Sequence, residues 1–201
     1  MLTPILQNKP IANGVYDLRV AFETRPSPGT FLHVACGEGR VLRRPISVCG
    51  WSDGVVRLVY AAKGDGTRWL SRQKPGDRLD VLGPLGRGFD CSLDVPTLLV
   101  GGGLGVPPML HCEDSLTATH ALLGFRDKDA VILESGFGSI EVFTDDGSAG
   151  TKGFPHQRLP ELLSDGKWAR VFACGPVKML QAVSSVCAEY DMETGQVNFF
   201  D

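Results

Sequence analysis

Short apolar segments separated by glycine, proline and polar turns occupy the first half of the chain. One of them has the sequence Val-Val-Arg-Leu-Val-Tyr, which is rich in β-branched residues. Short strands punctuated by turn residues at this spacing are typical of a small β-barrel. One short helix is expected at Thr67–Arg72, with Thr67 as its capping residue. The expected strands lie at Val15–Phe22, Thr30–Ala35, Ile46–Gly50, Gly54–Ala62 and Arg78–Leu82.

The second half changes to continuous apolar runs that alternate with helical segments. Thr97–Val100 is uninterrupted and ends in glycines, as expected of a strand that is buried on both faces. Strands that alternate with helices predict a parallel sheet with crossover connections. Two further strands are expected at Ala121–Gly124 and Arg170–Ala173, and helices at Pro107–Cys112, Leu159–Leu163 and Val177–Tyr190. We therefore expect two domains, at residues 1–92 and 93–201.

Composition supports two packed domains and excludes several classes of function. The chain has 201 residues, of which 43% are hydrophobic and 21% charged, and its net charge is −3. This length suits two domains of about 100 residues each. No basic run suggests nucleic acid as a partner, and no apolar run is long enough to span a bilayer. We expect a cytoplasmic protein whose six cysteines, none in a Cys-x-x-Cys pair, are reduced and mostly in the core.

The segment Arg43-Arg44-Pro45-Ile46-Ser47 has the residue types that a flavin site needs. Arg44 offers a permanently charged, forked donor for pyrophosphate oxygens, and Ser47 can hydrogen-bond the edge of the ring. Pro45 restricts the backbone between them. The alternative is a basic turn before an ordinary strand, and this segment alone does not decide between the two.

A second candidate phosphate site lies at Gly64-Asp65-Gly66-Thr67. Its glycines precede an expected helix, and free backbone amides at a helix N-terminus bind phosphate. Only a strand and a turn separate it from Arg44, so both could hold the same pyrophosphate. A plain joint between a loop and a helix is the alternative.

Two further segments each follow an expected strand and open a helix. In Gly101–Pro108, Gly103 and Gly105 would let the backbone approach a dinucleotide, although Pro108 replaces the third glycine of the Rossmann pattern. In Cys174-Gly175-Pro176, a small side chain at the strand end would let a nicotinamide pack close to the flavin. The alternative for the second segment is a tight turn with a buried thiol. Arg126, just past another strand, could meet cofactor phosphate or be a surface charge.

Together these segments resemble the ferredoxin-reductase-type superfamily, and more closely the electron-transfer subunit of NAD-dependent dihydroorotate dehydrogenase. The similar stretches are Arg43–Cys49, Gly64–Thr67, Asp80–Phe89, Leu99–Pro108, Leu122–Arg126, Thr144–Phe154 and Ala173–Pro176. The resemblance implies a six-stranded antiparallel β-barrel that binds FAD, followed by a Rossmann-like parallel sheet that binds NAD(H). It implies FAD contacts from Arg44, Pro45, Ile46, Ser47, Val59, Tyr60, Ala61, Gly66 and Thr67, and NAD(H) contacts from Gly103, Gly105, Cys174, Gly175 and Pro176.

The resemblance also implies a mechanism and a partner. A hydride passes from NADH to FAD, and electrons continue to an FMN-containing catalytic subunit in a hetero-oligomer that serves pyrimidine biosynthesis. Ser47 and Cys174 lie near the flavin ring, and no protein group acts as a nucleophile. The alternatives are a stand-alone NAD(P)H:flavin or ferredoxin reductase and a non-catalytic subunit that holds FAD for assembly.

Two features depart from the family pattern. The helix after Pro108 is short, so we expect a trimmed nucleotide domain. The family also carries a C-terminal segment of four cysteines that binds a [2Fe–2S] cluster. Gly195–Asn198 resembles the stretch before that segment, and its cysteine ligands are absent from these 201 residues. The sequence therefore represents either a shortened form or part of a longer chain.

Overall fold

The computed structural model describes residues 1–37, 42–192 and 194–198, and it divides the chain into two units. The first unit is Met1–Gly88 and the second is Phe89–Asp201. We expected the division after residue 92. Each unit has its own buried core, as the two blocks of hydrophobic pattern predicted.

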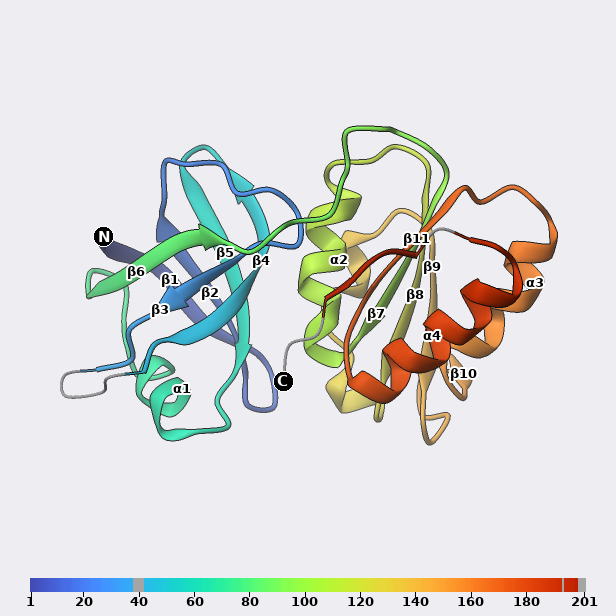
Figure 1. Ribbon diagram of the computed structural model, residues 1–201. Coiled ribbons are helices and arrows are strands. Elements are labelled where there is room, and N and C mark those ends of the chain that lie inside the picture. Colours follow the sequence, from blue (N-terminus) through green and yellow to red (C-terminus); the bar gives the residue numbers. More distant parts are fainter. Residues whose placement is uncertain (38–41, 193, 199–201) are drawn as a thin grey trace. The chain divides into compact units, whose positions relative to one another are not determined.

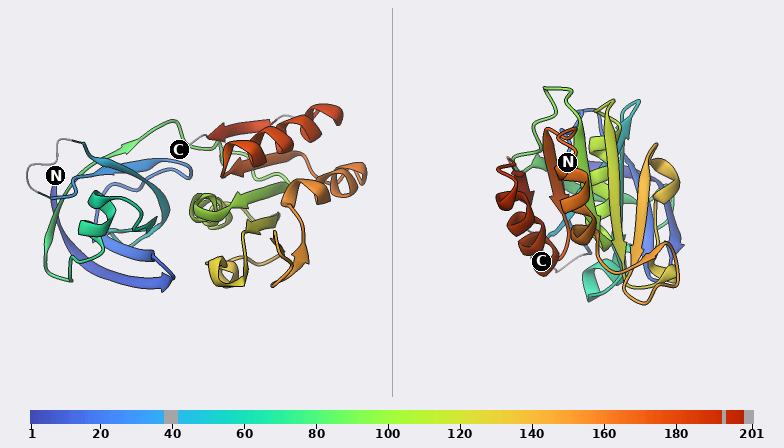
Figure 2. Two further views of the ribbon diagram at one scale, coloured as in Figure 1. Left: turned by 90° about the horizontal axis from the view of Figure 1, so that it is seen from below. Right: turned by 90° about the vertical axis from the view of Figure 1, so that its right-hand side faces the viewer.

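The first unit is a closed antiparallel barrel of six strands, as expected (Figure 1). The strands follow the order β1-β2-β5-β4-β3-β6 around the barrel. A short helix, α1 (Asp65–Leu70), lies at one end, where Leu70 joins the core (Figure 2). The strand bounds are β1 (Leu2–Ala12), β2 (Val15–Ala21), β3 (Phe31–Val34), β4 (Arg44–Ser52), β5 (Val55–Ala61) and β6 (Arg78–Leu85).

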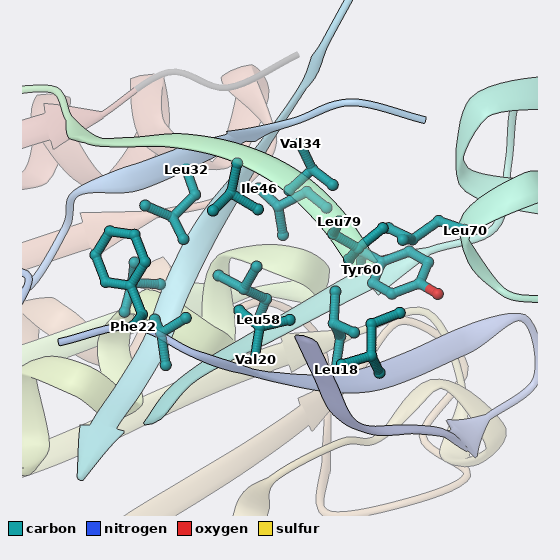
Figure 3. Packing of buried hydrophobic residues seen from close by; sticks show 14 of the residues in the cluster. Leu18, Val20, Phe22, Leu32, Val34, Ile46, Leu58, Tyr60, Leu70 and Leu79 are labelled. Atoms are coloured by element: carbon teal, nitrogen blue, oxygen red, sulfur yellow. The ribbon is translucent and has the colours of Figure 1, made fainter. Parts of the chain in front are cut away.

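Side chains from every strand of the barrel converge on one apolar core (Figure 3). Successive residues of a strand point to opposite faces, so every second residue of β4 and β5 faces inward. Leu58 and Val48 are fully buried there, and Trp51 and Trp69 pack against the cluster. This alternation decides which residues of the expected flavin segment remain on the outer face.

The second unit is a parallel sheet with the order β10-β9-β8-β7-β11-β12. Helix α2 covers one face, while α3 and α4 cover the other (Figure 1). The strand bounds are β7 (Thr97–Gly102), β8 (Thr119–Phe125), β9 (Ile140–Thr144), β10 (Thr151–Lys152), β11 (Arg170–Cys174) and β12 (Thr194–Asn198). The helix bounds are α2 (Val106–Glu113), α3 (Leu159–Ser164) and α4 (Val177–Glu189). Short 3₁₀ turns lie at Gly103–Gly105, Lys128–Ala130, Glu134–Gly136 and Pro155–Arg158.

The strand order places a topological switch at the middle of this sheet. The chain moves outward from β7 through β8, β9 and β10, then returns to the other side of β7 to form β11 and β12. Open α/β sheets bind ligands at such a point, outside the carboxyl ends of the strands. The ends of β7 and β11 are Gly101–Gly102 and Cys174, which both belong to segments that the sequence singled out.

Several local expectations differ from the structure. Strands β1, β9 and β12 were not anticipated, and neither was the two-residue strand β10, which lies within the stretch Thr144–Phe154. The helix after Pro108 is indeed short, because α2 has eight residues. No helix among the described residues is long and apolar enough to cross a membrane.

Truncation of Leu58 to alanine should destabilise the barrel strongly because this fully buried side chain leaves a cavity. We expect a loss of about 2–5 kcal/mol in the free energy of unfolding. Urea unfolding in a Trp168→Phe background, followed by the fluorescence of Trp51 and Trp69, measures it. The matched control is Leu82→Ala, a side chain 52% exposed, which should change stability by less than about 0.5 kcal/mol. Equal losses in both variants would contradict the packing described.

Candidate functional site

Arg44 and the first turn of α1 come together at one end of the barrel. A Cβ placed on Gly66 would lie 3.1 Å from Nε of Arg44 and 3.1 Å from Cβ of Cys36. The arginine side chain therefore lies directly against the helix backbone, and any larger residue at position 66 would crowd it. Arg44 forms no ion pair with any residue of the described ranges. The two sequence segments expected to share a phosphate thus converge on one cationic corner.

The neighbouring Arg43 has a different role. Its Nη1 donates to the Asp80 carbonyl oxygen at 2.9 Å, and its Nη2 pairs with the Asp80 carboxylate. The hydrogen bond from Arg43 holds the pKa of Asp80 below its usual value. Arg43 therefore links the start of β4 to β6, whereas no ion pair within the described ranges holds the Arg44 guanidinium.

Helix α1 begins one turn earlier than the sequence indicated. Gly64 is its N-cap, so the expectation that Thr67 caps the helix is wrong. Thr67 instead folds back, accepting from the Gly64 amide and donating to the Gly64 carbonyl oxygen, both at 3.2 Å. The first amides of a helix have no acceptor within it. The amides of Asp65 and Gly66 are therefore donors beside the Arg44 stem.

The expected flavin contacts on β4 and β5 divide between the two faces of the barrel wall. Ile46 and Tyr60 point into the core, where the Tyr60 hydroxyl donates to Oδ1 of Asn8 at 3.1 Å and burial raises its pKa. Their side chains are thus committed to packing, which leaves only their backbone for a ligand. Pro45 and Ser47 alternate with Ile46 and face outward.

On β5, Val59 and Ala61 likewise alternate with the inward-facing Tyr60. Val48 on β4 pairs with Leu58 on β5. Ser47 comes directly before Val48 and Val59 directly after Leu58, so these two residues lie opposite each other in the antiparallel pair. They consequently belong to neighbouring strands and share the outer face of the barrel.

In the second unit, the two expected nucleotide loops lie against each other. A Cβ on Gly105 would lie 1.9 Å from the Cys174 carbonyl oxygen and 2.7 Å from the Gly175 nitrogen. A Cβ on Gly102 would lie 2.9 Å from Cδ of Pro176. Side chains at these positions would force the loops apart. The absence of side chains therefore brings the ends of β7 and β11 into backbone contact at the switch point.

Gly103 lies on the open side of this contact. Its φ of +53° is in the left-handed region that favours glycine, and nothing lies within 4 Å of the position that a Cβ would take. The turn Gly103–Gly105 leads directly into α2. Pro107 and Pro108 in its first turn have no amide hydrogen, and the Val106 amide donates to the Gly103 carbonyl oxygen. The start of α2 therefore offers little to an anion, and what this loop provides is a backbone without side chains at Gly103.

Cys174 closes β11 as a small, neutral side chain. It is 4% exposed, and burial raises the pKa of its thiol to about 12. At neutral pH it is therefore protonated and cannot act as an activated nucleophile. Its place at the strand end suits packing against a flat ring.

Arg126 lies beyond the end of β8 and is already paired. Its Nε is 2.8 Å from Oδ2 of Asp127, and this hydrogen bond lowers the pKa of Asp127. The Lys128 amide donates to the Ser148 hydroxyl at 2.7 Å, so the loops after β8 and β9 are joined. The sequence did not predict this junction of the two loops, because it depends on the order of the strands.

Replacement of Gly105 by alanine should separate the two nucleotide loops because the new Cβ would overlap the Cys174 carbonyl oxygen. We expect a loss of stability of about 1–3 kcal/mol, as for other overpacked sites. Thermal unfolding followed by the fluorescence of Trp168 measures it. The control is Gly138→Ala in the same unit, where the nearest atom would be 3.5 Å away. Unchanged stability in Gly105→Ala would show that the loops are not in contact.

Among the described residues, no group of three or more His, Cys, Asp or Glu side chains is placed to hold a metal ion. All six cysteines are free thiols, and Cys91 alone among them is not fully buried.

Comparison with known proteins gives a consistent relationship. No family model matches the chain. It is 37% identical to the dihydroorotate dehydrogenase B (NAD(+)) electron transfer subunit of Fusobacterium nucleatum, over 91% of this chain and 78% of that protein. The subunits of the same name from Caldanaerobacter subterraneus and Bacillus mycoides are 34% and 37% identical. These matches cover 92% and 89% of this chain, and 76% and 75% of those proteins.

Solved structures share the fold. An NADH-dependent reduced ferredoxin-NADP oxidoreductase superposes with a TM-score of 0.79 and 28% identity, over 96% of this chain and 74% of that one. Phthalate dioxygenase reductase superposes with a TM-score of 0.77 and 20% identity, over 96% of this chain and 66% of that one. With the sequence relationship above, these similarities lead to one conclusion: the chain belongs to the family of electron transfer subunits of dihydroorotate dehydrogenase B (NAD(+)).

Proposed function

We propose that this chain passes electrons between NAD(H) and the FMN-containing catalytic subunit of dihydroorotate dehydrogenase by way of FAD. The observation that carries the proposal is the close packing around one glycine in each unit of a chain of this family. Arg44 lies against Gly66 in the first unit, and Gly105 lies against Cys174 in the second. At both places a Cβ added to the glycine would crowd the neighbouring atoms.

FAD would be held by the first unit. Arg44 and the amides of Gly66 and Thr67 supply charge and donors for its pyrophosphate. Pro45 and Ser47 on β4, with Val59 and Ala61 on β5, would line the outer wall for the rest of the cofactor. Ile46 and Tyr60 would contribute backbone atoms only, because their side chains fill the barrel core.

NAD(H) would be held by the second unit at the switch point. Gly103 and Gly105 would allow the pyrophosphate to approach the backbone of the loop that precedes α2. Cys174, Gly175 and Pro176 would form the wall for the nicotinamide, because none of them projects a long side chain.

The chemistry belongs to the cofactors, and the chain's own residues position them. FAD, when bound, would supply the capacity to take up a hydride from NADH and to release electrons one at a time. Ser47 would hydrogen-bond the ring edge. The buried Cys174 thiol stays neutral, so it places no charge beside the reacting rings. No proton transfer by a side chain is required of either residue.

The partner would be the FMN-containing catalytic subunit, joined in a hetero-oligomer that works in the cytoplasm. Electrons that reach FAD need an acceptor, and the family takes its name from that enzyme. In the family, a [2Fe–2S] cluster carries them between the two flavins.

Replacement of Arg44 by alanine should weaken FAD binding by about 10- to 100-fold, since a hydrogen bond to a charged group contributes about 1.5–3 kcal/mol. Titration of the apoprotein with FAD, followed by flavin fluorescence, measures the affinity. The matched control is Arg43→Ala, which removes an adjacent charge that is tied to Asp80. It should leave FAD affinity nearly unchanged. Equal losses in the two variants would contradict a specific role for Arg44.

Addition of NADH without oxygen should bleach the yellow absorbance of the FAD-loaded protein within seconds. This result requires both cofactor sites, whereas a subunit that only holds FAD for assembly would keep its colour. Co-purification with a dihydroorotate-oxidising flavoprotein separates the proposed subunit from a stand-alone reductase. A chain that bleaches but forms no such complex would favour the stand-alone reductase.

A further inference from the structure

Large apolar side chains are exposed at the carboxyl edge of the second unit's sheet. Leu104 is 40% exposed in the turn after β7, Val177 is 37% exposed at the start of α4, and Phe154 is 48% exposed after β10. Leu104 and Val177 adjoin the two loops proposed to hold NAD(H). Phe154 belongs to neither loop, so its exposure at the same edge needs a separate explanation.

Packing of the neighbouring proline holds Phe154 at the end of β8. Strand β10 lies parallel to β9, with Lys152 opposite Thr144, so the residues after Lys152 leave the sheet at its carboxyl edge. A Cβ on Gly124, one residue before the end of β8, would lie 2.7 Å from Cγ of Pro155. Pro155 therefore packs directly on the β8 backbone, and Phe154 precedes it in the chain.

Backbone hydrogen bonds and a stacked ring fix the position of Phe154. Its amide donates to Oε1 of Gln157 at 2.8 Å, and the Gln157 amide donates to the Phe154 carbonyl oxygen at 3.1 Å. The His156 ring stacks on the Phe154 ring, with centroids 5.8 Å apart and an interplanar angle of 15°. Burial lowers the pKa of His156, so this ring is neutral at neutral pH. An uncharged ring thus orients Phe154, while about half of the phenylalanine stays exposed.

The order of the strands determines where the parts of a dinucleotide would lie. Strand β7 lies between β11 and β8, and neighbouring strands are about 4.8 Å apart. The proposed nicotinamide wall is at the end of β11, and Gly103 follows β7. In NAD(H) the pyrophosphate joins the nicotinamide half to the adenosine half. A molecule with its nicotinamide at β11 and its pyrophosphate at β7 therefore carries its adenosine toward the end of β8, where Pro155 packs.

We propose that Phe154 stacks on the adenine ring of NAD(H) and is a binding determinant for the adenosine half of this cofactor. The inference rests on the proposed NAD(H) site and adds a residue to it. Adenine presents a flat π surface of the kind that stacks on aromatic side chains. A phenyl ring has no hydrogen-bonding group, so its contribution to affinity comes from stacking and apolar contact.

ADP-ribose is a suitable probe, because it contains the adenosine half of NAD(H) and cannot reduce FAD. Isothermal titration calorimetry of the FAD-loaded protein with ADP-ribose measures its affinity. Phe154→Ala should weaken binding about 5- to 100-fold, the range that alanine substitution gives for a stacked base. Phe154→Tyr should bind as the wild type does because it retains the ring. Phe154→Leu, which retains apolar bulk without a ring, should also be weakened.

The matched control is Tyr190→Ala, which removes another exposed aromatic side chain from the same unit. Tyr190 follows α4, which starts after β11 and returns to the opposite edge of the sheet before the parallel strand β12. Its affinity for ADP-ribose should equal that of the wild type. Circular dichroism checks that each variant is folded.

Proton NMR of ADP-ribose gives a direct readout of stacking. With saturating wild-type protein, the ring current of Phe154 should move the adenine H2 and H8 resonances upfield. Phe154→Ala should lose this shift and Phe154→Tyr should retain it. A change in affinity that came only from a displaced loop would not follow the presence of the ring in this way.

Several outcomes would overturn the inference and leave the proposed function standing. They are wild-type affinity for ADP-ribose in Phe154→Ala or in Phe154→Leu, and a wild-type protein that binds NADH but not ADP-ribose. A folded wild-type protein that binds neither NADH nor ADP-ribose would contradict the proposed NAD(H) site itself, and the role of Phe154 with it.

Discussion

The backbone contact between Gly105 and the Cys174–Gly175 peptide is the constraint on which the second unit's candidate site depends. Parallel strands place all their carboxyl ends at one edge of a sheet, and the switch in strand order leaves β7 and β11 adjacent there. The loops that leave these two strands can come together only where no Cβ intervenes. Glycine therefore serves two purposes here: Gly105 lets the two loops meet, and Gly103 adopts the left-handed conformation of the turn that leads into α2.

The first unit uses the same device with a charge added. Gly66 makes room for the stem of Arg44, so a permanent cation lies beside the amides of a helix N-terminus. The adjacent Arg43 is held by Asp80 instead. Two adjacent arginines therefore acquire different roles, because Asp80 lies within reach of Arg43 and Gly66 lies against Arg44. A cation for pyrophosphate and a link between strands are both present in one dipeptide.

Surroundings also separate the cysteines of the second unit. Burial keeps the Cys174 thiol neutral, as suits a wall beside a reacting ring. Cys91, in the segment before β7, is partly exposed, so its surroundings differ from those of the buried thiols.

The spacing of apolar residues and the turn residues between them were sufficient to predict most strands and helices, because each of those segments carries its own pattern. They failed for β1, where Pro4 and Pro10 and two register irregularities interrupt the alternation, and for β12, which has few strand-forming residues and is ordered by pairing with β11. The cap of α1 was misplaced because Gly64 has no side chain to signal it.

The candidate site shows the same division. Residue types alone indicated Arg44, the glycine loops and Cys174, since charge, size and backbone freedom are properties of single residues. Sequence did not reveal that Ile46 and Tyr60 point inward or that Arg43 is tied to Asp80. The amino-acid sequence by itself determined the two-part architecture and the residues suited to bind cofactors. Only the tertiary structure decided which of their side chains are free, because that depends on strand pairing between residues far apart in the chain.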